Sequence, residues 1–407
     1  MRILLQSIYP YMFLLLYLTI PFDNYMRALP NILLIALALA FPFVVSKNDF
    51  RKLKRLPTLL FIGLVLFVLG QALVLGRLQI DSPVLEKINL TIGLVILYVP
   101  IQGFKKIKKA LIYSSIAAIV FSVGSIIIGV YQGAEFELLN SGNLIEVMLV
   151  DRLYLGLLCV FSIVASYSLL KKTYHPNNAY YVVAIILNVL FILLIVSRIA
   201  IIALIVLFIL GFFYKRSKGT QLVFVVATLF LGLVLVFILN NDFRKKILYT
   251  PTNAESKGLV ANTLETEPRT IIWNCAITIS EIQNEFWRGL GFASTNDELI
   301  NCYQDSIQDE QKRAWLVAKK YNTHNQFLDM YLATGIIGTV LFVGFILFVF
   351  LRNKRQFFPT AVLLTLVLFL LVENLFHRQI GAYYFGFALI MLLIKANKPQ
   401  NEAIETL

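Results

Sequence analysis

Charged residues are scarce in this chain, and their scarcity excludes a soluble globular protein. Asp, Glu, Lys and Arg supply 14% of the 407 residues, hydrophobic residues supply 59%, and the mean hydropathy is +0.78. So much apolar surface exceeds what one protein core can bury. The sequence therefore predicts an integral membrane protein.

Several chemical motifs are also missing. The chain has no Asp-x-Asp, no cluster of His, Asp and Glu at metal-ligand spacing, no glycine-rich phosphate loop, and no Ser, His and Asp in hydrolase order. These absences favour chemistry without a metal ion or cofactor. Of the three cysteines, Cys159 lies in an apolar run, whereas Cys275 and Cys302 share a polar segment, which leaves a disulfide between them open.

The apolar residues form about twelve runs of some 20 residues, long enough to cross a bilayer as helices. The predicted fold is an all-α polytopic membrane protein. The first run has no cleavage site after it and is expected to be a retained anchor. The runs fall at roughly 3–22, 27–46, 57–76, 86–103, 110–131, 152–170, 179–196, 199–214, 220–239, 328–351, 358–375 and 379–395.

Basic residues gather in every second loop between these runs. They cluster at Lys47 to Arg55, Lys105 to Lys109 and Arg352 to Arg355, where acidic residues are nearly absent. This positive-inside bias predicts that both termini are cytoplasmic. The net charge of +13 then reflects topology and does not indicate nucleic-acid binding.

This topology divides the chain into four parts. Residues 1–239 hold transmembrane helices 1 to 9, residues 240–325 form a large periplasmic loop, residues 326–395 hold helices 10 to 12, and residues 396–407 are a cytoplasmic tail. The loop, of roughly 85 residues, is too long for an ordinary connection, which favours a functional role. We expect helices from Pro268 to Glu285 and from about Asp305 to Lys320, with a turn at RGLGFAST between them.

Arg198 interrupts an apolar stretch that is too long for one crossing. As a single helix, the residues from Tyr180 to Tyr214 would measure roughly 52 Å, against about 30 Å of hydrocarbon. We therefore expect two crossings with a turn near Arg198 on the outer side. The guanidinium either extends to the interface or binds an anion in an outward-facing cavity, since its fork matches phosphate oxygens.

His324 is one of only three histidines, and it lies where the polar loop re-enters the membrane. A histidine there is either a hydrogen-bonded interfacial residue or a general base. Asn325 follows it, and Asp329 is near enough on the expected helix to orient the imidazole or pair with an arginine. Gly335 and Gly338 are spaced for close packing against a neighbouring helix.

The second half of the chain, from about Ala179 to the end, resembles the O-antigen ligase and O-antigen polymerase superfamily of bacterial envelope glycosyltransferases. HNQFLDMYLATGIIG fits its pattern of His-Asn, nine residues and Gly-x-x-Gly. SRIAIIALI, PRTIIWNCAITI, WRGLGF and ENLFHRQIGAYYF resemble further family segments in the same order.

This resemblance implies a GT-C-like glycosyltransferase of the bacterial inner membrane. It would move a glycan from a polyprenyl diphosphate carrier to an acceptor at the periplasmic face. Arg198 and Arg269 correspond to the family's diphosphate-binding arginines, and His324 to its essential histidine. Arg152, Glu373 and Arg378 are supporting candidates, although each also suits a structural interfacial pair.

The acceptor stays open at this point. Transfer to lipid A core would make the protein a ligase, transfer to another repeat unit would make it a polymerase, and transfer to a protein is a third option. The other partners are membrane lipids. A transporter or flippase is the competing class, but its ionisable residues should lie near the bilayer midplane in two related halves. Here they lie at one face.

Overall fold

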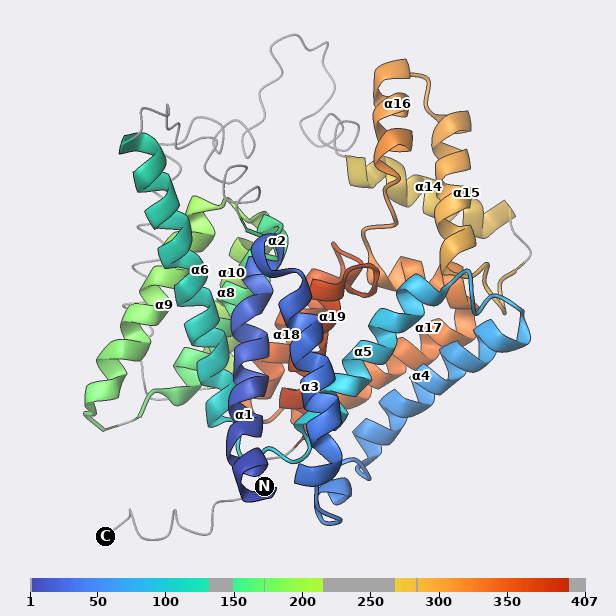
Figure 1. Ribbon diagram of the computed structural model, residues 1–407. Coiled ribbons are helices and arrows are strands. Elements are labelled where there is room, and N and C mark those ends of the chain that lie inside the picture. Colours follow the sequence, from blue (N-terminus) through green and yellow to red (C-terminus); the bar gives the residue numbers. More distant parts are fainter. Residues whose placement is uncertain (1, 132–148, 172, 215–267, 283–284, 395–407) are drawn as a thin grey trace.

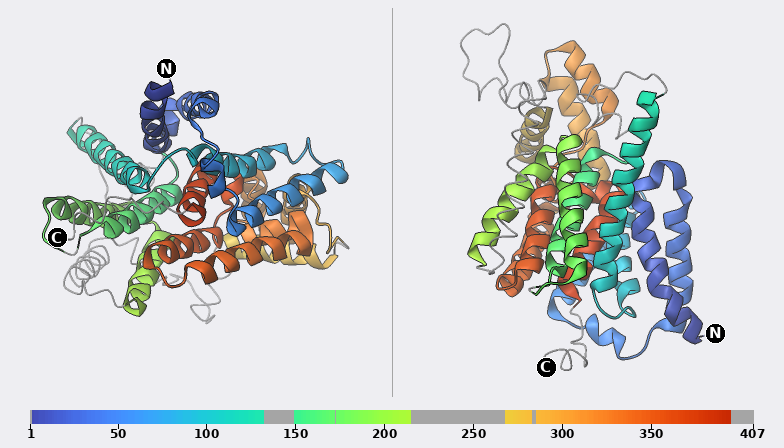
Figure 2. Two further views of the ribbon diagram at one scale, coloured as in Figure 1. Left: turned by 90° about the horizontal axis from the view of Figure 1, so that it is seen from below. Right: turned by 90° about the vertical axis from the view of Figure 1, so that its left-hand side faces the viewer.

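The computed structural model describes residues 2–131, 149–171, 173–214, 268–282 and 285–394 (Figure 1). Every regular element in these ranges is a helix, which confirms the all-α prediction for this part of the chain. Most helices run side by side in one bundle, and α14, α15 and α16 project from the end opposite the start of α1 (Figures 1 and 2).

Six helices are long and apolar enough to cross a membrane. Within the described residues they cover Ile3–Met26, Leu56–Val74, Lys105–Ile128, Arg152–Leu169, Pro176–Leu194 and Gln326–Asn353. They correspond to α1 (Arg2–Thr19) with the short turns η1 (Ile20–Phe22) and α2 (Asp23–Met26), then α4 (Leu56–Val74), α6 (Lys105–Tyr131), α8 (Arg152–Leu169), α9 (Pro176–Leu194) and α17 (Gln326–Asn353). The chain is therefore a multi-pass membrane protein.

The remaining expected runs also form helices where the structure describes them, but these helices are shorter. They are α3 (Ala28–Val44), α5 (Ser82–Tyr98), α10 (Arg198–Phe213), α18 (Phe357–Leu370) and α19 (Gln379–Leu393). The expected run at 220–239 lies outside the described residues, as does the 396–407 tail. The prediction of about twelve crossings, and the domain boundaries built on it, stay predictions.

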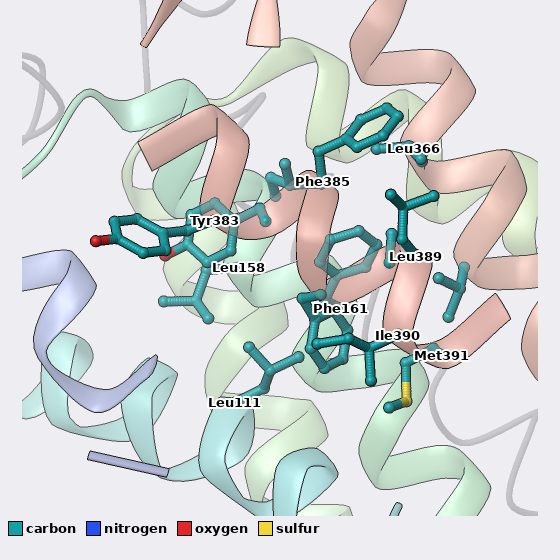
Figure 3. Packing of buried hydrophobic residues seen from close by; sticks show 14 of the residues in the cluster. Leu111, Leu158, Phe161, Leu366, Tyr383, Phe385, Leu389, Ile390 and Met391 are labelled. Atoms are coloured by element: carbon teal, nitrogen blue, oxygen red, sulfur yellow. The ribbon is translucent and has the colours of Figure 1, made fainter. Parts of the chain in front are cut away.

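The core of the bundle centres on α8 and α19, whose residues are buried on almost all sides. Phe161 of α8 packs against Phe387 of α19, with ring centroids 5.4 Å apart. Leu111 of α6 and Leu366 of α18 join the same cluster (Figure 3). A helix that is apolar all round is either surrounded by other helices or faces lipid, and the burial of α8 and α19 shows that these two are surrounded. The packing of α8 and α19 thereby holds the first residues of these two helices in fixed positions.

The three projecting helices have a small core of their own. They are α14 (Pro268–Ile282), α15 (Phe292–Ser306) and α16 (Glu310–Lys319), and their cluster includes Ile272, Leu299 and Leu316. A disulfide between Cys275 and Cys302 joins α14 to α15, with Cα atoms 5.8 Å apart. The sequence left this bond open, and it missed α15, because RGLGFAST was assigned wholly to a turn.

Helix α17 is broken at Gly335, where φ is +70° and ψ is −173°. The chain that follows α14 fills the break: the Leu290 and Gly291 amides donate to the carbonyls of Leu332 and Ala333 at 2.7 and 2.9 Å. The Ile336 amide donates to the Phe286 carbonyl at 2.9 Å. The glycine thus supplies a backbone conformation that only glycine readily adopts, besides the close packing expected from the sequence.

Helix α4 and the segment between α4 and α5 also hold this connection. Gln71 Nε2 donates to the Arg288 carbonyl at 2.6 Å, and Arg77 Nη1 donates to the Gly289 carbonyl at 2.7 Å. Asp81 Oδ1 accepts from the Ala293 amide at 2.8 Å, near the start of α15. The projecting helices are therefore attached to both α17 and the first half of the chain.

Gly335→Ala should destabilise the protein by about 1–3 kcal/mol, because the backbone conformation there is nearly exclusive to glycine. A Cβ at this position would also overlap the carbonyl of Trp287. The matched control is Gly344→Ala in the same helix, where a Cβ would have nothing within 4 Å. Thermal unfolding in detergent should show a lowered midpoint for the first variant alone; equal midpoints would mean that the break tolerates a side chain.

Candidate active site

A cavity of about 390 Å³ lies where the bundle meets α14 and α16. We call it the arginine cavity. It brings together five of the residues predicted from the sequence: Arg152, Arg198, Arg269, His324 and Glu373. The rest of its lining consists of Asp151, Leu153, Val196, Ser197, Ile199, Pro268, Ile272, Trp315 and Tyr321.

Each of the three arginines stands at the start of a helix. Arg152 begins α8, Arg198 begins α10, and Arg269 is the second residue of α14. A helix N-terminus carries a partial positive charge, so a cation there is unfavourable for the helix itself, whereas an anion is favourable. Three arginines and three helix starts around one cavity therefore make a site suited to an anion such as a diphosphate.

The turns before these helices fix where the arginines point. Asp151 caps α8 by accepting from the Leu153 amide at 2.9 Å. Between α9 and α10 the turn passes through Val196 with φ of +51°, which is strained for a β-branched residue. Ser197 is buried against Gly156 of α8, where a Cβ would lie 2.6 Å from the Ser197 Oγ. The turn predicted near Arg198 is confirmed.

His324 sits directly before α17 with a left-handed backbone, φ of +44°. Its amide donates to Asn322 Oδ1 at 3.0 Å. Asn325 caps the helix, since its side chain accepts from the amides of Phe327 and Leu328 at 3.0 and 3.2 Å. Asn325 thus acts on the site by holding the preceding histidine at the helix start.

The imidazole of His324 pairs with the carboxylate of Glu373. Nδ1 of His324 lies 3.0 Å from Oε2 of Glu373, and the two side chains are 18% and 8% exposed. The Tyr154 hydroxyl donates to the other oxygen, Oε1, at 3.4 Å. A carboxylate on Nδ1 favours the tautomer that carries its proton there, which leaves Nε2 as the nitrogen able to accept a proton from a substrate.

Hydrogen bonds join the segment that carries His324 to the segment that carries Glu373. Asn374 Nδ2 donates to Thr323 Oγ1 at 2.8 Å, next to the histidine in sequence. The Phe376 amide donates to Gln326 Oε1 at 3.1 Å, and the Trp273 indole of α14 donates to the Thr323 carbonyl at 3.0 Å. Glu373 and His324 are 49 residues apart in the chain. The hydrogen bonds from Asn374 to Thr323 and from Phe376 to Gln326 hold the two segments together next to the pair.

Burial alone would raise the pKa of the Glu373 carboxyl. The hydrogen bond and charge of His324, followed by the charges of Arg378 and Arg269, outweigh burial and lower the pKa below its ordinary value. Glu373 is therefore charged at neutral pH. It can orient the imidazole and stabilise the imidazolium that forms when His324 takes a proton.

The prediction that Asp329 orients His324 or pairs with an arginine is wrong. Asp329 is fully buried, and its Oδ2 lies 2.9 Å from Nε2 of His377 and accepts from Gln326 Nε2 at 3.2 Å. Burial lowers the pKa of His377, but the charge and hydrogen bond of Asp329, together with the charge of Glu373, outweigh burial, so the net shift is upward. Asp329 is not among the residues that line the arginine cavity.

Arg378 forms the structural pair anticipated from the sequence. Its Nη1 donates to Asp151 Oδ2 at 3.2 Å, the same carboxylate that caps α8. Arg378 therefore contributes to the site through Asp151 and through the charge it exerts on Glu373.

Within the described residues, no group of three or more His, Cys, Asp or Glu side chains is placed to hold a metal ion.

A family model described as O-antigen ligase matches residues 183–343. The match supports membership of the O-antigen ligase and polymerase superfamily. It spans Arg198, Arg269 and His324, the arginines and the histidine that meet in the cavity. No curated protein matches the chain. The O-antigen ligase match supports a ligase- or polymerase-type glycosyltransferase of envelope polysaccharide synthesis.

Of the other residues that line the cavity, three contribute contacts that the sequence did not predict: Asp151, Trp315 and Tyr321. Asp151 was not singled out in the sequence, although it caps α8 and binds Arg378. Trp315 and Tyr321 line the cavity in contact with each other, with ring centroids 5.0 Å apart, and Tyr321 lies 5.3 Å from the His324 ring. An aromatic before the His-Asn pair was visible in the sequence, but nothing there gave its direction.

Glu373→Gln should lower kcat at least about tenfold, because the neutral amide cannot stabilise an imidazolium through Nδ1.

Glu373→Gln should also change how the stability of the protein depends on pH. Since folding lowers the pKa of Glu373, its contribution is fully present above the ordinary glutamate pKa and is lost as pH falls through the folded pKa. The unfolding midpoints of wild type and variant should thus converge on acidification, whereas Glu281→Gln, at an exposed glutamate of α14, should match wild type throughout.

Proposed function

We propose that this protein transfers a glycan from a polyprenyl diphosphate carrier to the hydroxyl of an acceptor, as an O-antigen ligase acting on lipid A core. The observation that carries the proposal is the arginine cavity, in which three arginines at helix starts face a histidine paired with a carboxylate. An anion site beside a base is what such a transfer requires.

The reaction breaks the bond between the donor's anomeric carbon and the diphosphate oxygen, and the diphosphate leaves with the electron pair. Arg198 and Arg269 bind the diphosphate oxygens, and the helix starts add partial positive charge where negative charge develops. Arg152 faces the same cavity and supports them. The acceptor oxygen then bonds to the anomeric carbon and gives up its proton.

His324 takes that proton at Nε2. Glu373 holds the ring through Nδ1 and balances the charge of the imidazolium. No step in this scheme needs a metal ion, and we propose that the reaction is metal-independent.

The cavity is proposed to open on the periplasmic side of the inner membrane. The basic loops place the large polar segment there by the positive-inside rule. The Cys275–Cys302 disulfide in that segment suits an oxidising compartment. Both termini are then cytoplasmic.

Polymerisation of repeat units is the alternative, and it would use the same base and the same anion site. Only the acceptor differs: lipid A core for a ligase, a second lipid-linked repeat unit for a polymerase. A transporter or flippase is less favoured, because a base held by a carboxylate serves proton transfer and the arginines gather at one end of the bundle.

The test is glycan transfer by the purified protein from a polyprenyl diphosphate donor, with lipid A core and lipid-linked repeat units offered separately. Product on lipid A core supports the ligase, and chain extension supports the polymerase. Chelator should leave either rate unchanged. Donor that is moved across a liposome membrane but never consumed would overturn the enzyme proposal in favour of a transporter.

A further inference from the structure

A second cavity, of about 450 Å³, adjoins the arginine cavity. We call it the side cavity. It lies among α2 and the starts of α8 and α19, and it shares Asp151 with the arginine cavity. Its polar lining consists of Asp23, Asn24, Asp151, Tyr154, Arg378, Gln379 and Tyr383.

The two cavities differ in charge. Three arginines and two carboxylates, those of Asp151 and Glu373, line the arginine cavity, whereas the side cavity has a single arginine, Arg378, which is bonded to Asp151 at 3.2 Å. Asp23 adds a second carboxylate to the side cavity. A phosphate or carboxylate ligand would meet these acids, so the side cavity favours a neutral polar ligand over a diphosphate.

The side chain of Gln379 is held so that its carbonyl oxygen is available to such a ligand. Its Nε2 donates to Asn31 Oδ1 at 2.5 Å and to the Tyr383 hydroxyl at 3.1 Å. The amide nitrogen is therefore occupied, and the carbonyl Oε1 has no hydrogen bond to any described residue. Together with the Asp23 carboxylate it offers acceptors for hydroxyl donors, while Ile20, Pro30 and Ile380 supply apolar surface.

The side cavity also lies close to the base. Tyr154 lines it, and the Tyr154 hydroxyl bonds to Oε1 of Glu373 at 3.4 Å. The other oxygen of Glu373 bonds to His324. A molecule in the side cavity is therefore separated from the catalytic pair by one side chain.

We propose that the side cavity binds the acceptor, through the neutral, hydroxyl-rich sugar units next to the hydroxyl that is glycosylated. This rests on the proposed function and adds to it a division of labour: the diphosphate of the donor lies among the arginines, and the acceptor glycan lies against Asp23 and Gln379. The chemistry is the same whether the sugars belong to lipid A core or to a lipid-linked repeat unit.

Gln379→Ala and Asp23→Asn should each raise the KM for the acceptor about three- to tenfold, which is the effect of one lost hydrogen bond. The KM for the polyprenyl diphosphate donor should stay within about twofold. Gln304→Ala, at an exposed glutamine of α15 outside both cavities, is the matched control and should change neither. Lipid A core and lipid-linked repeat units are titrated separately, and the acceptor whose KM rises is the occupant.

A second measurement does not depend on turnover. A photo-crosslinking amino acid replacing Gln379 in living cells should form an adduct that stains for carbohydrate, and the same amino acid replacing Gln304 should not. A rise in donor KM with acceptor KM unchanged would assign the side cavity to the donor instead. Absence of transfer by wild type would refute the proposed function, whereas normal transfer with no effect of either substitution and no adduct would refute the side-cavity proposal alone.

Discussion

His324→Ala is expected to lower kcat by about 100- to 10,000-fold, the usual contribution of a general base. Donor binding should be nearly unchanged, because a base acts mainly on the transition state. The pairing of Nδ1 with Glu373 at 3.0 Å makes the expectation specific, since the carboxylate's only described histidine partner would be lost. The measurement is single-turnover glycan transfer together with donor binding.

The control is His175→Ala. His175 caps α9, where its Nδ1 accepts from the Asn177 amide at 3.2 Å. Its loss should cost stability of about 1 kcal/mol without changing kcat. Near wild-type turnover by His324→Ala would make the Glu373 pair a purely structural link between the two loops.

Arg198→Lys and Arg269→Lys are expected to lower kcat/KM by about 100-fold each, comparable with removal of one donor from an oxyanion site. Lysine keeps the charge but loses the two-pronged hydrogen bonding that matches phosphate oxygens. Because lysine keeps the positive charge at each helix start, the substitution should leave the interaction with the helix dipole unchanged.

Arg288→Lys, at an exposed arginine beside the α17 break, is the control and should retain activity. Donor affinity measured by calorimetry should fall for the two cavity variants and not for the control. Equal activity of Arg198→Lys and wild type would mean that charge alone suffices there, and would favour an interfacial arginine over a diphosphate ligand.

The sequence named five residues that the structure brings together in the arginine cavity. Arg198 and His324 could be identified because each is a polar residue at the edge of an apolar run, and hydropathy reveals such edges. Arg269 lies within the polar segment and was identified only from the resemblance to the O-antigen ligase and polymerase superfamily. The role of Glu373 could not be assigned, because its contact with His324 spans 49 residues and depends on how two loops meet. Asp329 was misassigned because closeness in sequence says little about which side of a helix faces a cavity.

The prediction of the fold from the sequence was limited in the same way. Long apolar runs predicted helices at nearly the right places, since lipid leaves few alternatives. Helix α15 was missed because its sequence, FASTNDELINCYQDS, is polar and begins in a segment rich in turn-forming residues. Its stability comes from packing against α14 and α17, which sequence spacing does not reveal.

The break in α17 changes which residues unfold together. The amides of Leu290 and Gly291 bond to carbonyls of α17, and the amide of Ile336 bonds back to Phe286. These amide hydrogens can exchange with solvent only when the helix itself opens. Leu290 and Gly291 lie in a loop by chain order, but their amides should show the slow hydrogen exchange of a buried helix and should lose that protection in a single step with α17.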